Sequence, residues 1–278
     1  MKTIIITADG FEHRYVTNKL SNVLGRNLLA VIVEQHSKQR FSFEKLNDIK
    51  KRYGYLRILE RIITKMVKKI LREHQRQEEG LKKVLGQSAL DFSFDCPVIA
   101  VSSANSSRSI ELIEDIKPDY LFIYGTSVIK RKVLLMPLRV ALNLHTGNSP
   151  YYRGSGTVFW PLLNKEPEMV GSTVHECTPD IDGGDIYGRI SVKLNENDDH
   201  HTAFAKCVKE GANLYSNIAK RLVSGEKIQT QMQDFSIGKE YRFKDLTFVQ
   251  ELKMEYRRRN GSLRRLILQK KDEPPPNI

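Results

Sequence analysis

Asn143, His145 and Asp182 are three side chains whose chemical types suit acyl transfer to an amine. An amide N–H can donate to the oxyanion that forms as a carbonyl becomes tetrahedral, and an imidazole can move protons near neutral pH. A carboxylate beside the imidazole fixes its tautomer and favours its charged form. Such a set requires no covalent nucleophile. On spacing alone, a hydrogen-bonded structural histidine remains the alternative for His145.

The first two of these side chains stand at the end of a predicted strand. Residues 140–145 read VALNLH and are followed at once by TGNSP, which predicts a strand that ends in a loop. Asn143 and His145 are two residues apart, so both project from one face of that strand. The end of a strand is where an open α/β sheet places its chemistry.

Asp182 belongs to an acidic loop that contains two glycines. Residues 179–185 read PDIDGGD and lie between two strand-like runs, 171–176 and 186–193. Glycine permits backbone bends that other residues resist, so this loop can turn sharply. We therefore expect Asp182 to reach back to His145.

Four motifs, in this order, resemble the signature of the 10-formyltetrahydrofolate-dependent formyltransferases. They are NLH at 143–145, the segment from Pro150 to Arg153 and Gly154, GSTVH at 171–175 and DGGDI at 182–186. The family includes glycinamide ribonucleotide transformylase, methionyl-tRNA formyltransferase and the N-formyltransferases of nucleotide-linked amino sugars, which this sequence resembles most. The resemblance covers residues 95–225, fits the N-terminal strand loosely, and does not extend to residues 36–90 or to the C-terminal tail.

The resemblance implies formyl transfer from 10-formyltetrahydrofolate to a primary amine, without a metal. Asn143 would stabilise the oxyanion, His145 would transfer the amine and leaving-group protons, and Asp182 would orient His145 and the water beside it. The residues expected to hold the folate, mostly through the main chain, are Gly125, Thr126, Ser127, Val128, Ile129, Asp180, Ile181 and Gly183. A simple turn is the alternative for residues 126–129.

The amine is expected to be the amino group of a nucleotide-linked amino sugar. Arginine can bind a phosphate, and a tyrosine ring can stack on a base or a sugar. The residues expected to bind this substrate are Gly10, His13, Arg14, Tyr151, Tyr152 and Arg153. A loop that leads into a helix is a natural anion site. A solvated turn is the alternative for residues 10–14, because the glycine-rich dinucleotide fingerprint is absent.

Other substrates and a second reaction stay open. The C-terminal portion is shorter than the tRNA-binding domain expected of methionyl-tRNA formyltransferase, and the loop at 9–14 departs from the glycine-rich phosphate loop of the purine enzyme. A hydrolase that releases formate from 10-formyltetrahydrofolate is the second interpretation. Such enzymes usually carry an N-terminal regulatory domain, which we do not expect before a first strand that starts at Lys2. A formyltransferase of a non-sugar amine is a further alternative.

Length and composition are those of a globular protein. The 278 residues are 40% hydrophobic and 28% charged, and no apolar run approaches the ~20 residues of a membrane span. The first residues, MKTIIITADG, predict a buried strand and not a signal peptide. Cys96, Cys177 and Cys207 are widely spaced and odd in number, so we expect neither a disulfide framework nor a zinc site, and a reducing cytoplasmic location.

Basic residues are concentrated in one segment. Residues 37–87 hold 15 Lys and Arg against 6 Asp and Glu, which is +9 of the net charge of +12. Apolar residues between 41 and 86 recur at intervals of three and four, which predicts two or three amphipathic helices with basic outer faces. We interpret residues 36–90 as a solvated helical insertion that packs on the core, and we do not expect nucleic acid as a partner. The alternatives are a homodimer interface and an anionic partner, including a nucleic-acid-binding module.

The order of elements predicts an α/β fold with a Rossmann-like formyltransferase sheet and helices on both faces. We expect a helical insertion after the second strand and a short C-terminal extension. Residues 1–226 are assigned to the catalytic domain, with the insertion 36–90 inside it, and residues 227–278 to the extension. The last residues of the extension are expected to be disordered because of their proline-rich composition.

Three further histidines are assigned structural positions. His175 is expected to be a packed or supporting residue of a strand, and His200 and His201 are expected in the first turn of the helix 202–223. Two aromatic and basic segments, 238–243 and 255–259, follow that helix. Such segments can bind bases and phosphates, but we expect these two to cap an edge of the core.

Overall fold

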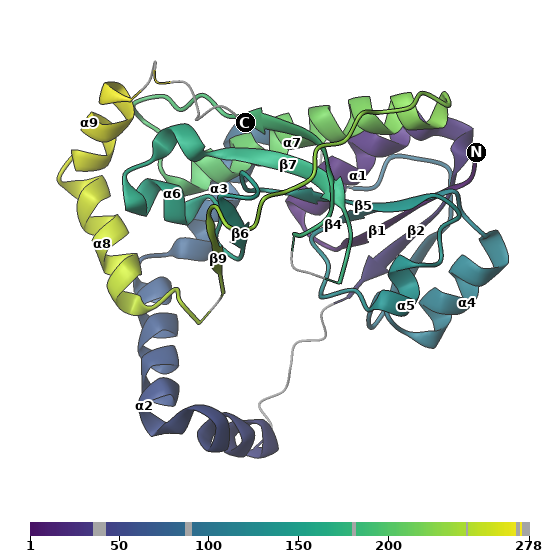
Figure 1. The fold of residues 1–278 in the computed structure, drawn as a ribbon. Helices are drawn as coiled ribbons and strands as arrows, with labels where there is room; N and C mark the ends of the chain where they lie inside the picture. Colours follow the sequence, from purple (N-terminus) through teal and green to yellow (C-terminus); the bar gives the residue numbers. More distant parts are fainter. Residues whose placement is uncertain (36–42, 87–90, 180–181, 243, 271–272, 274–278) are drawn as a thin grey trace.

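The computed structural model describes residues 1–35, 43–86, 91–179, 182–242, 244–270 and 273. Its centre is a mixed sheet (Figure 1). In the order in which they pair, its strands are β3 (Val98–Val101), β2 (Leu28–Glu34), β1 (Thr3–Ala8), β4 (Tyr120–Tyr124), β5 (Val140–His145), β7 (Gly171–Glu176) and β8 (Ile186–Ser191). The first five run parallel, whereas β7 pairs antiparallel with both β5 and β8.

Helices cover both faces of this sheet, as the sequence predicts. Helices α1 (Phe11–Leu24), α3 (Glu73–Leu85) and α7 (His200–Val223) pack on one face, and α4 (Ser107–Ile116) and α5 (Arg131–Leu134) pack on the other. Side chains alternate between the two faces of a strand. Along β1, Ile5 joins the first layer, while Ile4 and Ile6 join the second. The sheet is therefore apolar on both sides, as parallel sheets are.

Helix α7 is fixed to the sheet by polar contacts as well as by packing. The Tyr215 hydroxyl accepts a hydrogen bond from the Ile123 N–H at 2.9 Å and donates one to the Leu142 carbonyl at 2.7 Å. Asp199 caps the first turn of the helix and forms a capping box with Thr202. These contacts join α7 to β4 and β5, the two strands that carry the candidate site.

The insertion forms two helices with different environments in the part of the chain that the structure describes. Helix α2 (Phe43–Ile70) runs away from the sheet and packs against α8 (Phe248–Arg259). Arg72, with φ of 53°, separates α2 from α3. Leu81 and Leu85 of α3 belong to the main hydrophobic core. The predicted helices are thus present, but α3 is an integral part of the core layer.

A second hydrophobic core lies beside the sheet and includes residues from the C-terminal extension. Strand β6 (Tyr152–Gly154) pairs in parallel with β9 (Lys239–Tyr241), and Tyr241 stacks on Trp160 of α6 (Phe159–Asn164) at 4.5 Å. Helices α8 and α9 (Ser262–Gln269) add Met254, Leu263 and Ile267. Two short 3-10 segments, Gly25–Asn27 and Pro167–Met169, complete the elements.

The two aromatic and basic segments after α7 pack against this second core. Tyr241 is buried within it, and Arg257 donates from Nη1 to the Leu163 carbonyl at 2.5 Å. Residues 274–278, expected to be disordered, lie outside the described residues. None of the helices traced through the described ranges is both long enough and apolar enough to cross a bilayer.

Candidate active site

Strand β5 presents Asn143 and His145 on one face at its carboxyl end, as predicted. Leu142 and Leu144 alternate with them and enter the core layer beneath α7. Because β7 runs antiparallel to β5, its His175 pairs directly with Asn143. The junction between the parallel and antiparallel parts of the sheet is therefore the place where these side chains meet.

Asp182 reaches back to His145, as the glycine-containing loop predicts. Its Oδ1 lies 3.5 Å from His145 Nδ1 and 3.4 Å from His175 Nε2, and its Oδ2 accepts a hydrogen bond of 2.7 Å from the Gly154 N–H. Burial alone would raise the pKa of this carboxyl, but the two imidazoles and the Gly154 N–H together hold it well below its usual range. Asp182 is therefore an anion at any pH near neutrality.

His145 is held between the Asp182 carboxylate and the main chain. Its Nε2 lies 3.2 Å from the Tyr152 carbonyl oxygen, which can only accept a hydrogen bond. Burial lowers the pKa of His145, while the negative charge of Asp182 opposes that shift. A Cβ at Gly147 would lie 2.3 Å from His145 Nε2, so only glycine leaves room for this ring position. The imidazole is thus fixed in orientation, and burial holds its pKa below the ordinary value.

His175 is a site residue that the sequence interpretation placed only in a supporting role. Its Nδ1 donates to the Glu176 carbonyl at 2.7 Å, so in the neutral ring Nε2 is the accepting nitrogen. That Nε2 lies 3.3 Å from Asn143 Nδ2. One amide N–H of Asn143 is therefore directed at His175. The sequence signal is the Thr-x-His of β7, which has meaning only once its register against β5 is known.

Gln233 was missed by the sequence analysis. Its Nε2 donates to the carbonyls of Asp182 and Gly184, at 2.8 and 2.5 Å. Both carbonyls belong to the acidic loop, whereas Gln233 belongs to the C-terminal extension, and its side chain is buried. Asp182 itself has a φ of 51°, a backbone conformation that such contacts must hold in place. No local motif around Gln233 indicates this role.

A single large cavity of about 1630 Å³ contains Asn143, His145, His175 and Asp182 in its wall. Small-molecule sites commonly occupy ~300 to 1000 Å³. This cavity is therefore large enough for two ligands side by side. Its wall also includes residues of the insertion, among them Lys68, Lys69 and Arg72, which the sequence analysis did not assign to a site.

The loop proposed to hold folate borders the same cavity. The residues of this loop in the cavity wall are Gly125, Thr126, Ser127, Val128 and Ile129. Ser127 donates from its N–H and its hydroxyl to the buried Glu34 carboxylate, at 2.7 and 2.5 Å. Gly125 has a φ of 64°, and a Cβ there would lie 2.3 Å from His13. The loop is therefore fixed in shape. Gly183 does not line the cavity, and Asp180 and Ile181 lie outside the described residues.

The residues proposed to bind the amine substrate are not brought together in one place. His13 lines the cavity, and its Nε2 donates to the Gly125 carbonyl at 3.2 Å. Arg14 pairs with Asp9 at 2.7 Å, and the Arg153 guanidinium lies 4.8 Å from the centre of the Phe235 ring. The members of the proposed set that are absent from the cavity wall are Gly10, Arg14, Tyr151, Tyr152 and Arg153. Their role in substrate binding stays a prediction.

No family model matches this chain, whereas curated proteins match part of its length. Over 111 residues, the chain is 32% identical to the bifunctional polymyxin resistance protein ArnA of Wigglesworthia glossinidia brevipalpis. The match covers 40% of this chain and 17% of that protein, so the chain spans a small part of this relative.

Solved structures match over most of the chain. A 4-N formyltransferase from Francisella tularensis aligns with a TM-score of 0.53 at 16% identity, over 88% of this chain and 77% of that one. A sugar N-formyltransferase from a Shewanella species aligns with a TM-score of 0.55 at 14% identity, over 88% and 78%. The N-formyltransferase from Helicobacter canadensis, solved with folinic acid and dTDP-3-aminofucose, aligns with a TM-score of 0.57 at 16% identity, over 88% and 72%. The chain therefore has the fold of the sugar N-formyltransferases, as its ordered motifs predict.

Proposed function

We propose that this protein transfers a formyl group from 10-formyltetrahydrofolate to the amine of a nucleotide-linked amino sugar. The observation that carries the proposal is the convergence of Asn143, His145 and Asp182 in one cavity at the end of β5. These three residue types at this position of the sheet suit acyl transfer to an amine. The shared fold and the four ordered motifs support the same reaction.

The residues divide the work of the reaction between them. The amine nitrogen attacks the formyl carbon, and the carbonyl oxygen becomes an oxyanion. In this proposal an N–H of Asn143 donates to that oxygen. His145 takes a proton from the nitrogen at Nδ1, the ring nitrogen that does not face the Tyr152 carbonyl, and returns it to N10 of the departing tetrahydrofolate. Asp182 keeps the imidazole oriented and stabilises its charged form.

A covalent route through a cysteine is disfavoured by the electrostatics of the cavity. Cys177 lines the same cavity, but burial, with the charges of Asp182 and Glu176, raises the pKa of its thiol. A thiol with a raised pKa is a poor nucleophile, because the thiolate is the reactive form. Direct attack by the amine is therefore the favoured route.

The folate is proposed to lie against residues 125–129, whose main chain is held by Glu34 and His13. The neighbour from Helicobacter canadensis was solved with folinic acid, a related folate. The nucleotide-linked sugar is proposed to fill the remaining part of the cavity towards α2 and α3. Its identity as an amino sugar is supported by the dTDP-3-aminofucose bound to that same neighbour.

The direct test is an assay of tetrahydrofolate release from 10-formyltetrahydrofolate with a panel of amines. The panel contains 3-amino and 4-amino dideoxy sugars on dTDP, UDP and GDP, glycinamide ribonucleotide, charged tRNA and a reaction without amine. We expect release to depend on an amino sugar nucleotide. Rapid release without amine would indicate the hydrolase, and activity with a non-sugar amine alone would overturn the sugar assignment while leaving formyl transfer in place.

A further inference from the structure

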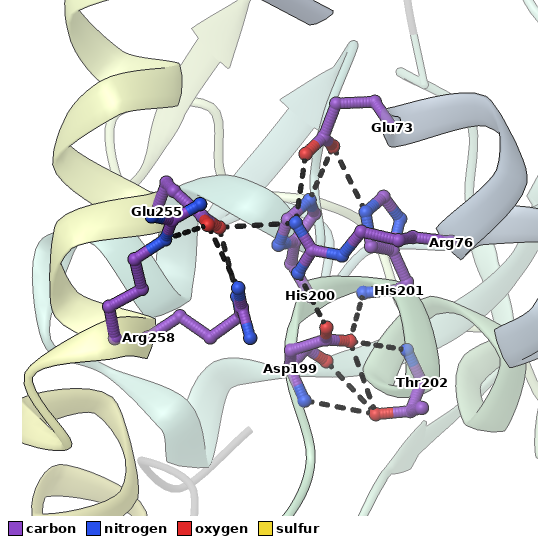
Figure 2. A network of polar contacts seen from close by, with 9 residues as sticks. Glu73, Arg76, Asp199, His200, His201, Thr202, Glu255 and Arg258 are labelled. Atoms are coloured by element: carbon purple, nitrogen blue, oxygen red, sulfur yellow. Dashed lines mark hydrogen bonds and ion pairs between the residues drawn. The ribbon is translucent and has the colours of Figure 1, made fainter. Parts of the chain in front are cut away.

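Glu73, His200 and His201 form a second cluster of titratable side chains on the wall of the same cavity. Glu73 is the first residue of α3 and the two histidines begin α7, so the cluster lies where the insertion meets the core (Figure 2). One ligand atom from each residue lies within 4.8 Å of the others. The side chains are 8 to 13% exposed, so the cluster is largely shielded from solvent.

The distances from Glu73 to the two histidines match those between ligands of one metal ion. His200 Nε2 and His201 Nε2 lie 3.1 and 3.0 Å from the same oxygen, Glu73 Oε2. Two ligand atoms that are each ~2.1 Å from an ion, at angles of roughly 90 to 110°, are separated by about 3.0 to 3.4 Å. His201 Nε2 is buried and makes no hydrogen bond among the described residues, despite this proximity. It is placed as a ligand atom would be.

The residue types also suit a metal. Two imidazole nitrogens and one carboxylate oxygen form a donor set that divalent transition metals prefer, and zinc sites with two histidines and one glutamate are common. Both histidines must be neutral to ligate. A hard cation such as Mg²⁺ would prefer oxygen ligands.

Hydrogen bonds from residues outside the cluster hold the Glu73 carboxylate in place (Figure 2). Its Oε1 accepts from Arg76 Nη1 at 3.2 Å, which leaves Oε2 directed at the histidines. Arg76 Nη2 in turn donates to Asp199 at 2.9 Å. Asp199 also caps α7, because its Oδ1 accepts from the His201 N–H at 3.0 Å. Such outer contacts orient the ligands of a metal site.

A glycine brings the two helices together near this cluster. A Cβ at Gly80 of α3 would lie 3.3 Å from the main-chain carbon of His201, which is closer than a side chain usually packs. Glycine therefore allows α3 to approach the first turn of α7. The Phe159 ring packs edge-on against the His200 ring, with 5.4 Å between the ring centroids, and limits the rotation of His200. The ligand atoms thus come from elements that pack directly on each other.

We propose that Glu73, His200 and His201 bind one divalent transition-metal ion, with Zn²⁺ the ion that these donors suit best. The ion joins α3 of the insertion to α7 of the core. Three protein ligands leave at least one coordination position open, and because all three residues line the cavity, that position faces it. The proposal does not depend on the identity of the amine or on formyl transfer.

The test uses the full chain without an affinity tag, stripped of metal by a chelator and then dialysed. Zn²⁺ alone is titrated by calorimetry, and Co²⁺ alone is titrated by its visible absorption. Glu73→Gln and His200→Gln are compared with His74→Gln, which changes an exposed histidine of the same cavity outside the cluster. Asp182→Asn reports whether the ion binds instead at the other carboxylate and histidine group. X-ray absorption of the zinc-loaded wild type gives the ligand set independently of variant folding.

We expect one ion to bind per chain, and the X-ray absorption spectrum to show two imidazole nitrogens among the ligands. The affinity for Zn²⁺ should fall by at least ~10-fold in Glu73→Gln and in His200→Gln. His74→Gln and Asp182→Asn should bind as the wild type does, and Zn²⁺ should raise the melting temperature of the wild type. Equal binding by all variants, loss of binding in Asp182→Asn, or no binding by the wild type at 100-fold molar excess would each overturn the proposal. In the last case the cluster is a metal-free ion-pair network.

Discussion

Asp182 Oδ1 faces His145 Nδ1 at 3.5 Å, although one residue lies in a loop, the other lies in a strand, and they are 37 positions apart in the chain. Both side chains are buried, and the carboxylate keeps its charge there because it is also hydrogen-bonded by the Gly154 N–H. A buried charge is stable only when it is paired or hydrogen-bonded. The imidazole therefore has a fixed counter-charge at the point where a proton must move.

Replacement of Asn143, His145 or Asp182 by alanine should reduce turnover by at least ~10²-fold each, the scale of losing an oxyanion donor or a proton carrier. Turnover is measured as tetrahydrofolate release at saturating cofactor. Asp185→Asn is the matched control, because Asp185 lies in the same loop but pairs with Thr230 outside the cavity. Near-normal turnover in any two of the three alanine variants would refute the assignment.

The dependence of kcat on pH should report the environment of His145. A neutral imidazole accepts the amine proton, and burial lowers its pKa, so the acid limb should have a midpoint below the ordinary value of ~6.5. Asp182 stabilises the protonated ring. Asp182→Asn should therefore move the midpoint further down, a shift that an NMR titration of the His145 ring can also detect. An upward shift would mean that the carboxylate does not act on this imidazole.

His175 should act on the reaction through Asn143. If its Nε2 fixes the Asn143 amide, His175→Leu should lower kcat by roughly 10-fold and leave KM for the folate little changed. The free energy that corresponds to this loss of kcat lies within the ~0.5 to 3 kcal/mol by which residues in contact are coupled. The combination with Asn143→Ala should cost no more than Asn143→Ala alone. Fully additive losses in this double-mutant cycle would show that His175 has a separate role.

The two helices of the insertion should differ in their contribution to stability. Leu81 of α3 is 4% exposed within the main core, and Leu56 of α2 is 84% exposed. Leu81→Ala should lower the free energy of unfolding by about 2 to 5 kcal/mol, whereas Leu56→Ala should change it by less than ~0.5 kcal/mol. Urea denaturation of both variants measures this difference. Equal effects would mean that α3 is not part of the cooperative core.

Much of the fold and the centre of the site could be predicted from local patterns. Alternation in residues 140–145 placed Asn143 and His145 on one face of a strand end, and the glycines after Asp182 predicted the loop that returns to them. These features are encoded within a few residues of chain. Residues 125–129, which the family resemblance indicated as a folate-binding loop, line the cavity, and their role in folate binding stays a prediction.

The remaining parts depend on contacts between distant segments. His175 could not be assigned because its partner Asn143 is set by the antiparallel register of β7 on β5. The cluster of Glu73 with His200 joins residues 127 positions apart, which no sequence spacing reveals. The break between α2 and α3 at Arg72 could not be predicted either, since a non-glycine residue with positive φ is uncommon and has no local sequence signature.

The hydrogen bonds of Gln233 make the shape of the Asp182 loop depend on a distant part of the chain. The loop that contains Asp182 precedes α7 and Gln233 follows it, yet one side-chain amide holds the loop carbonyls of Asp182 and Gly184. A chimera in which the corresponding segment of a protein with the same fold replaced residues 227–278 would also lose Gln233 and its hydrogen bonds to the loop. The geometry of the Asp182 loop therefore depends on the C-terminal segment, which cannot be treated as a freely replaceable module.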